Sequence, residues 1–159
     1  MNEKFSLPEF NKSLDGLVFS GAELRTIEAL GLTVDDIKKL VSAEPIAEGS
    51  YALIFDVPTN DRDIIAKVWK NPKEDSLRAD HENVALRLLR FHKARNVPRL
   101  IGYLPTSTII FEDKINGTPI ENYDTNAIKQ LANALTSLHS IKLNSYGKPL
   151  TKRKKGTFG

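Results

Sequence analysis

The chain has 159 residues, of which 40% are hydrophobic and 27% are charged, enough for one domain or one lobe of a larger domain. It contains no cysteine, which excludes a disulfide framework and a thiolate metal site. The formal net charge of +3 is misleading, because Lys148 and the basic run 152–155 carry five positive charges and the remainder carries −2. The basic charge is therefore a local feature near the C-terminus and does not indicate a basic binding surface.

The histidines are scattered at positions 81, 92 and 139 and form no ligand cluster. No apolar run approaches the roughly 18 residues of a membrane-spanning helix, and the N-terminus lacks the hydrophobic stretch of a signal peptide. We therefore expect a cytoplasmic protein with no membrane partner.

Two helices are expected in residues 1–44, which we interpret as an N-terminal helical extension. The first spans about Ala22–Leu30, and Gly31 can end it as a left-handed C-cap. The segment Thr33–Asp36 resembles a capping box and starts the second, which Pro45 ends. The apolar positions of this second helix share one face: Val34, Ile37, Leu40 and Val41.

From residue 46 to residue 69 the hydrophobic period changes to two, which indicates strands. The small-residue turn Gly49-Ser50-Tyr51 precedes one strand, and the chain returns along Asp63–Trp69 after the turn Thr59-Asn60-Asp61. We expect one face of the first of these strands to carry Tyr51, Leu53, Phe55 and Val57.

Residues 74–95 form the longest helix candidate, which Val97-Pro98 would stop. Two short strands follow near Leu100–Leu104 and Thr108–Asp113, and a last helix spans about Thr125–Ile141. This last helix carries an apolar stripe of Ile128, Leu131, Leu135 and Leu138. The order predicts an α+β fold, with a five-stranded antiparallel sheet and one long helix inserted between its third and fourth strands.

Lys67 is the first candidate for a functional role. It lies in the strand Asp63–Trp69, both faces of which are mostly apolar. A buried ammonium group needs an anionic partner, because an unpaired buried charge is costly. The pattern is equally compatible with a lysine that reaches from an edge strand into solvent.

Glu82 is the second candidate. It lines up with the apolar residues Ala85, Leu86 and Leu89 of its predicted helix, where a solvated carboxylate is not expected. The alternative is an ion pair with Arg78 at the margin of that stripe. We expect the solvent side of the helix to carry Arg78, Asp80, Arg87 and Arg90. A strand lysine followed by an inward-facing helix glutamate predicts that Lys67 and Glu82 meet.

Five stretches, taken in order, resemble the aminoglycoside phosphotransferase and choline kinase family, the small-molecule branch of the kinase-like fold. They are Glu48–Tyr51 with the strand after it, Ile65–Val68, Glu82–Leu89 with Val97–Gly102, Ile110–Ile120 and Leu131–Ile141. The resemblance covers about residues 45–147. It implies a protein-kinase-like N-terminal lobe at 45–122 that binds nucleotide, and a linker with the first helix of an incomplete second lobe at 123–159.

In this family the strand lysine contacts the α- and β-phosphates of ATP and pairs with the helix glutamate, and these roles fall on Lys67 and Glu82. The turn at Gly49, Ser50 and Tyr51 can bind phosphate oxygens through backbone N–H groups, although the full Gly-x-Gly-x-x-Gly motif is absent and an ordinary turn is the alternative. The hinge, whose backbone contacts adenine, corresponds to Glu112, Asp113 and Ile115.

The family's catalytic aspartate and its Mg²⁺ ligands lie beyond the Leu-His helix, and this sequence ends at Gly159 without them. We expect no catalytic or metal-binding residue here, and whether the chain is itself an enzyme stays open. The resemblance implies the ATP-binding portion of a phosphotransferase that transfers the γ-phosphoryl group to the hydroxyl of a small-molecule acceptor. Mg²⁺ would be held by the missing lobe.

Two alternatives remain, a fragment of a protein kinase-like enzyme and a non-catalytic nucleotide-binding or interaction module of the pseudokinase kind. Three further features are weaker indications of function. The segment Gly156–Gly159 resembles a glycine-rich loop but follows no strand, and the run Lys152–Lys155 is more typical of a solvated linker than of a nucleic-acid site. His139 has no visible catalytic partner.

Overall fold

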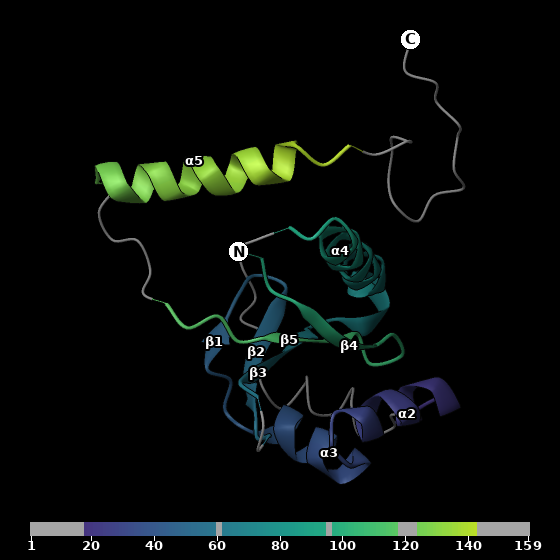
Figure 1. Ribbon diagram of the computed structural model, residues 1–159. Helices are drawn as coiled ribbons and strands as arrows, with labels where there is room; N and C mark the ends of the chain where they lie inside the picture. The colour runs from purple at the N-terminus through teal and green to yellow at the C-terminus, as the bar shows by residue number, and fades with distance from the viewer. Residues whose placement is uncertain (1–17, 60–61, 95–96, 118–123, 143–159) are drawn as a thin grey trace.

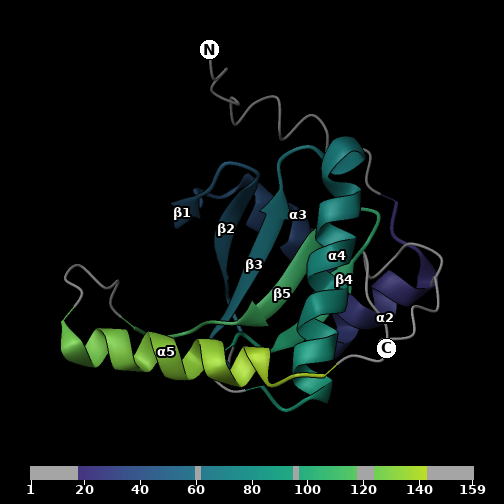
Figure 2. The same cartoon turned by 90° about the horizontal axis from the view of Figure 1, so that it is seen from above.

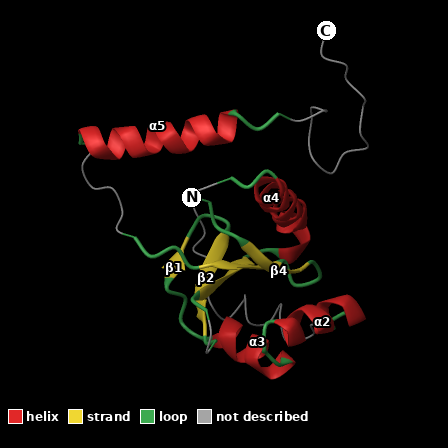
Figure 3. Cartoon of the chain, in the orientation of Figure 1, coloured by secondary structure: helices red, strands yellow, loops and turns green. Residues whose placement is uncertain are grey.

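The computed structural model describes residues 18–59, 62–94, 97–117 and 124–142. The described residues form four helices and a five-stranded antiparallel sheet, as the sequence predicted (Figures 1 and 3). In chain order the elements are α2 (Gly21–Ala29), α3 (Val34–Ser42), β1 (Ala47–Glu48), β2 (Ala52–Val57), β3 (Ile64–Trp69), α4 (Pro72–Phe91), β4 (Leu100–Leu104), β5 (Ile109–Asp113) and α5 (Thr125–His139). The segments Gly156–Gly159, Lys152–Lys155 and Thr118–Ile120 lie outside the described residues.

The strands are arranged in the order β1-β2-β3-β5-β4, so β3 and β5 lie in the interior of the sheet. Lys67 of β3 lies opposite Ile110 of β5, and Ile65 lies opposite Glu112. The pairing of β4 with β5 is irregular between Leu100 and Gly102. At Gly102 a Cβ atom would come within 2.9 Å of the Thr26 methyl group, so glycine lets β4 approach α2 closely.

Helices cover both faces of the sheet (Figures 1 and 2). Helices α2 and α3 pack on one face, and α4 crosses the other. The largest hydrophobic cluster lies on the α2 and α3 side, where Ile27, Ile37 and Leu40 pack with Phe55 and Phe111. The expected boundary at residue 44 therefore runs through a shared core, since residues before and after it belong to one cluster.

The starts of α2 and α3 follow from capping chemistry. Ser20 and Glu23 form a capping box at α2, and Thr33 and Asp36 form the predicted one at α3. Gly31 has a φ of +71°, the left-handed conformation that suits glycine after a helix. Helix α3 ends at Ser42, before Pro45, because the chain is already extended at Ala43.

The limits of α4 differ from the predicted range 74–95. Asn71 is the N-cap and accepts a hydrogen bond from the backbone N–H of Glu74, so the helix begins with Pro72 in its first turn, a position that favours proline. The helix ends at Phe91, because Lys93 takes a left-handed φ of 53°. The N–H of Ala94 then donates to the Leu89 carbonyl at 2.9 Å, which closes the helix before the proline is reached.

Helix α5 is set apart from the sheet (Figure 1), and none of its residues is buried. Three residues of its predicted apolar stripe are exposed: Ile128, Leu131 and Leu135. No helix in the described part of the chain is long and apolar enough to cross a membrane.

Glu23 joins α2 to the turn between β4 and β5. Its side chain is 1% exposed and accepts hydrogen bonds from the N–H of Thr106 at 2.8 Å and from the Thr106 hydroxyl at 2.9 Å, besides those from Ser20. Burial raises the pKa of Glu23, but the hydrogen bonds from Ser20 and Thr106 outweigh it, and the pKa lies below its usual value. The carboxylate is therefore a fully bonded buried charge that links elements far apart in the sequence.

We expect Glu23→Ala to lower the free energy of unfolding by about 2–4 kcal/mol, because it removes charge-assisted hydrogen bonds and leaves the Thr106 N–H without its acceptor. Urea denaturation near neutral pH measures this change. The matched control is Glu28→Ala on the exposed side of the same helix, which should change stability by less than about 0.5 kcal/mol. Equal effects of the two substitutions would contradict a structural role for Glu23. Because the pKa of Glu23 is lowered in the folded state, its contribution is present above the ordinary glutamate value of 4.5 and is lost as the pH falls through the lowered pKa.

Candidate functional site

The candidate site lies on the face of the sheet that α4 covers. Side chains alternate along β3, so Ala66 and Val68 enter the large cluster, and Lys67 and Trp69 point to the opposite side. The hydrophobic clusters on this side are small. One contains Ala52, Trp69 and Ala79, and the other contains Leu86, Leu100 and Ile110. Polar groups therefore occupy the space between them.

Lys67 and Glu82 form an ion pair in which the ammonium group contacts both carboxylate oxygens. The Lys67 Nζ atom lies 2.7 Å from each carboxylate oxygen of Glu82, and the two side chains are 27% and 25% exposed. Nζ also lies 5.0 Å from the centre of the Trp69 ring, within range of a cation–π contact. The predicted contact between the strand lysine and the helix glutamate is confirmed. The lysine is neither buried without a partner nor extended alone into solvent.

Arg78, the alternative partner for Glu82, makes other contacts. Arg78 lies 3.5 Å from the Asp75 carboxylate, and its guanidinium group stacks on the Tyr51 ring at 4.0 Å. The buried positions of α4 are Asp75, Ala79 and Leu86, and this spacing places Glu82 on the face toward the sheet.

Asp80 was expected on the solvent side of α4, and this was wrong. It is partly buried and accepts a hydrogen bond from the Tyr103 hydroxyl at 2.6 Å. Burial and this hydrogen bond raise the pKa of Tyr103. The contact attaches α4 to β4 beside the candidate site. Sequence reasoning missed it, because Tyr103 comes from a strand 23 residues further along the chain.

Glu112 is buried next to the ion pair. It lies in the interior strand β5, opposite Ile65 and Leu100, and only 5% of the residue is exposed. Among the described residues its Oε1 atom has no hydrogen-bond partner. Burial, followed by the negative charge of Glu82, raises the pKa of Glu112 to about 7, and a hydrogen bond between the two carboxyl groups acts in the same direction, although Lys67 lowers it. The sequence prediction placed Glu112 in a hinge that acts through its backbone, and the structure adds a side chain that reaches the charged pair.

The turn at Gly49, Ser50 and Tyr51 lies beside the end of β3, where the Lys70 N–H donates to the Tyr51 carbonyl at 2.9 Å. The Gly49 N–H is already used, since it donates to the Ala52 carbonyl at 2.9 Å. Within the described chain the N–H groups of Ser50 and Tyr51 donate no hydrogen bond and could bind an anion. Tyr51 was expected on one face of β2 with Leu53, and this was wrong. It lies exposed in the turn, against Arg78.

The segment after β5 is partly committed to other contacts. The Asp113 N–H donates to the Arg99 carbonyl at 3.0 Å, and the Asp113 carboxylate pairs with the Arg99 side chain at 2.9 Å. The Lys114 N–H donates to the Asp63 carbonyl at 2.8 Å. Ile115 is 61% exposed, and among the described residues its N–H donates no hydrogen bond. Ile115 is thus the position in this segment best suited to a backbone contact with a ligand.

These groups follow one another along β3. The turn lies beside its C-terminal end, Lys67 lies near its middle, and Asp113 pairs with Ile64 at its N-terminal end. At the usual rise, the strand separates the two ends by about 17 Å. Such an arrangement offers unused N–H donors at both ends of the strand and a partly exposed ammonium group between them, which suits an elongated anionic ligand. Among the described residues no cluster of His, Asp and Glu side chains is suited to hold a metal ion.

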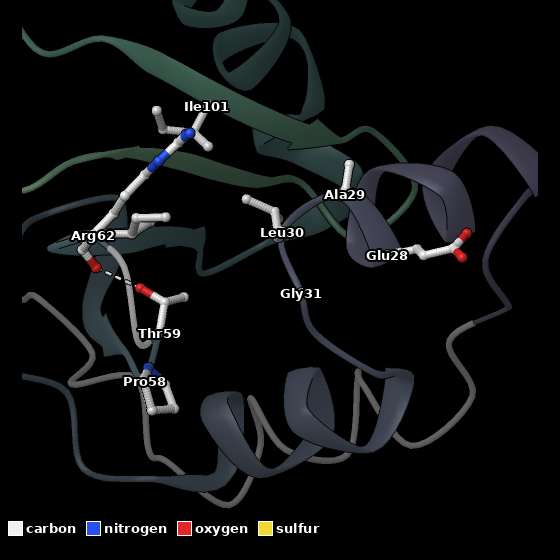
Figure 4. Close-up of a pocket in the computed structure, with 9 residues that line it drawn as sticks. Glu28, Ala29, Leu30, Gly31, Pro58, Thr59, Arg62 and Ile101 are labelled. Carbon is white, nitrogen blue, oxygen red and sulfur yellow. Dashed lines mark hydrogen bonds between the residues drawn. The ribbon is translucent and has the colours of Figure 1, made fainter.

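A hollow of about 410 Å³ lies elsewhere, between the end of α2 and the β2–β3 hairpin. Figure 4 shows the Arg62 side chain extending toward Ile101, with Thr59 hydrogen-bonded to the Arg62 carbonyl, while Glu28 lies at the far end of the hollow. The hollow does not include Lys67 or Glu82, and no unpartnered buried polar atom points into it. It lacks the features of a built ligand site.

We expect Glu112→Gln to become more stable relative to the unchanged protein as the pH rises. The folded-state pKa of about 7 lies above the ordinary glutamate value of 4.5, so between these values Glu112 holds more proton in the folded protein than in the unfolded chain. The contribution of Glu112 to stability must then fall with rising pH in the unchanged protein, and the neutral glutamine removes this contribution. Urea unfolding at about pH 5 and about pH 8 measures the difference, with Glu28→Gln as the exposed control. A difference in stability between Glu112→Gln and the unchanged protein that stays constant over this range would contradict the assignment.

Comparisons with known proteins add no family to this geometry. No protein-family model matches the sequence, and no curated protein shows significant similarity to it. The kinase-like interpretation therefore rests on the five sequence stretches and on the contacts described above.

Proposed function

We propose that this chain is the ATP-binding portion of a phosphotransferase with a kinase-like fold, which transfers the γ-phosphoryl group of ATP to the hydroxyl of a small molecule. The observation that carries the proposal is the two-pronged ion pair between Lys67 and Glu82, 2.7 Å at each oxygen. The pair holds the ammonium group in place without burying it completely. A phosphate can therefore approach the exposed part of Lys67 while Glu82 keeps the side chain oriented.

The surroundings of the pair support the same proposal. The five-stranded antiparallel sheet with α4 across one face is compatible with a kinase-like lobe. Donors without a partner in the described chain lie at both ends of β3, at Ser50 and Tyr51 on one side and at Ile115 on the other. The proposed roles are phosphate binding for the turn and Lys67, orientation of Lys67 for Glu82, and contact with the base for the segment Glu112–Ile115.

The chemical step would need more than these residues supply. Phosphoryl transfer depends on Mg²⁺ bridging the phosphates and on a group that orients the attacking hydroxyl. In the proposal both come from a second lobe, to which α5 belongs, and that lobe also holds the acceptor. The exposed stripe of Ile128, Leu131 and Leu135 is the surface that such a lobe would cover.

We expect the chain to bind ATP weakly, and Lys67→Met to weaken binding by about 10- to 100-fold, since a charge-assisted hydrogen bond to phosphate contributes about 1.5–3 kcal/mol. Isothermal titration calorimetry measures the dissociation constant. The matched control is Lys38→Met, which removes an exposed lysine from α3 on the opposite side of the sheet and should leave binding unchanged. Lys67→Arg tests whether charge alone is sufficient, and circular dichroism verifies that the variants fold.

The same preparation should release no phosphate from ATP beyond the background rate. Equal affinity of Lys67→Met and the unchanged protein would overturn the proposed site. Phosphoryl transfer by this chain alone, to any acceptor, would show that the catalytic groups have been misplaced. Both results are independent of the identity of the acceptor.

A further inference from the structure

Glu112 has an unusual place for a carboxyl group. It projects from the interior strand β5, it is 5% exposed, and its Oε1 atom is buried with no hydrogen-bond partner among the described residues. Native proteins pair almost all such groups, because an unpartnered buried polar atom loses its hydration without compensation. Glu23, the other glutamate buried to this degree in the described part of the chain, accepts four hydrogen bonds from Ser20 and Thr106. Glu112 instead has an unpartnered Oε1 atom and lies against the Glu82 carboxylate, with which it can share a hydrogen bond only when one of the two carries a proton. This arrangement points to a role other than packing.

Ionisable groups act on Glu112 from two directions. Lys67 projects from β3, diagonally across from Glu112 on the same face, and Glu82 approaches from α4. On the β4 side the opposite residue is Leu100, which is apolar.

Other ionisable groups nearby are occupied or face elsewhere. Tyr103 of β4 and Asp80 of α4 are hydrogen-bonded to each other. Asp113, the next residue of β5, pairs with Arg99. Among the described residues, Lys67 is therefore the cation that acts on Glu112, and it is also the partner of Glu82.

The charge of this group depends on one proton. Glu82 already occupies two hydrogen-bonding directions of the Lys67 ammonium group. With Glu112 ionised, one positive and two negative charges give a net charge of −1, and an approaching phosphate is repelled. With Glu112 protonated the net charge is zero, and the carboxyl group becomes a hydrogen-bond donor. A polyanion at Lys67 therefore favours the protonated form of Glu112.

We propose that Glu112 is a proton-carrying member of the Lys67 phosphate site, taking up a proton from solvent when a nucleotide phosphate binds at Lys67 and opposing binding in its ionised form. The proposal rests on the proposed function, because it assumes that Lys67 binds phosphate. The step is a proton transfer alone: an O–H bond forms on the Glu112 carboxylate, the corresponding bond of the buffer acid breaks, and no bond between heavier atoms changes. Glu112 acts through the charge of the site and is a positioning residue for Lys67 and its ligand.

The pH range follows from the pKa of Glu112, which burial and Glu82 raise to about 7 in the ligand-free protein. A bound phosphate adds negative charge and raises it further. Nucleotide affinity should therefore fall as the pH rises through this value, and the bound state should hold more protons than the free state over the same range.

The test is calorimetry with ATP at about pH 7 and about pH 8, each in two buffers of different ionisation enthalpy, which gives both the dissociation constant and the number of protons taken up. From the lower to the higher pH, the dissociation constant of the unchanged protein should rise about three- to fivefold more than that of Glu112→Gln. Proton uptake should be larger in the unchanged protein by a fraction of one proton. The ionisation of ATP itself is common to both proteins and cancels. Glu28→Gln, on the other side of the sheet, should behave like the unchanged protein.

The outcomes separate the two proposals. If ATP does not bind, or if Lys67→Met binds it as well as the unchanged protein, the proposed function and this inference are both overturned. If Lys67 is required but Glu112→Gln and the unchanged protein show the same pH dependence and proton uptake, only the role of Glu112 is overturned.

If Glu112→Gln fails to fold, carbon-detected NMR of the unchanged protein replaces it. The Glu112 carboxyl is then titrated with and without ATP. An upward shift of its pKa on binding supports the role, and an unshifted value overturns it.

Discussion

The alternation of side chains along β3 is the constraint on which the rest of the structure depends. Ile64, Ala66 and Val68 enter the large cluster beneath α2 and α3, so Lys67 and Trp69 must point to the opposite side. A shift of one residue in the register would move the lysine into the apolar core and the apolar residues toward α4. The position of the ammonium group is therefore set by hydrophobic burial on the other face of the sheet.

The two faces of the sheet have different chemistry as a result. The α2 and α3 side contains the continuous core, and the α4 side contains two small apolar clusters with charged groups between them. Helix α4 is attached by polar contacts as well as by packing, through Glu82 to Lys67 and through Asp80 to Tyr103. Exposed or half-exposed polar contacts contribute less to stability than continuous apolar burial, so the site lies on the less strongly packed face.

Glu23 and Glu112, both buried, illustrate how surroundings decide what a carboxyl group does. Glu23 is held by donors from Ser20 and Thr106, which keep its pKa low and make it a structural link between α2 and the β4–β5 turn. Glu112 has no donor on Oε1 and lies near a second carboxylate, so its pKa rises to about 7. The same side chain thus favours the charged form in one place and is poised between two forms in the other.

The sequence by itself determined the features that depend on residues near one another along the chain. These are the order of the elements and the capping boxes at Ser20 and Thr33, of which the second was predicted. The alternation along β3 likewise places Lys67 on the face opposite to Ala66 and Val68. Only the tertiary structure decided that Glu82 pairs with Lys67 and leaves Arg78 to Asp75 and Tyr51, since the sequence allowed either the strand lysine or the arginine four residues away on the same helix. The protonation of Glu112 was also beyond sequence reasoning, because burial and charges from β3 and α4 set the pKa of a side chain on β5. Local periodicity reports which face a residue occupies, whereas the partner and the charge of a side chain depend on residues that only folding brings together.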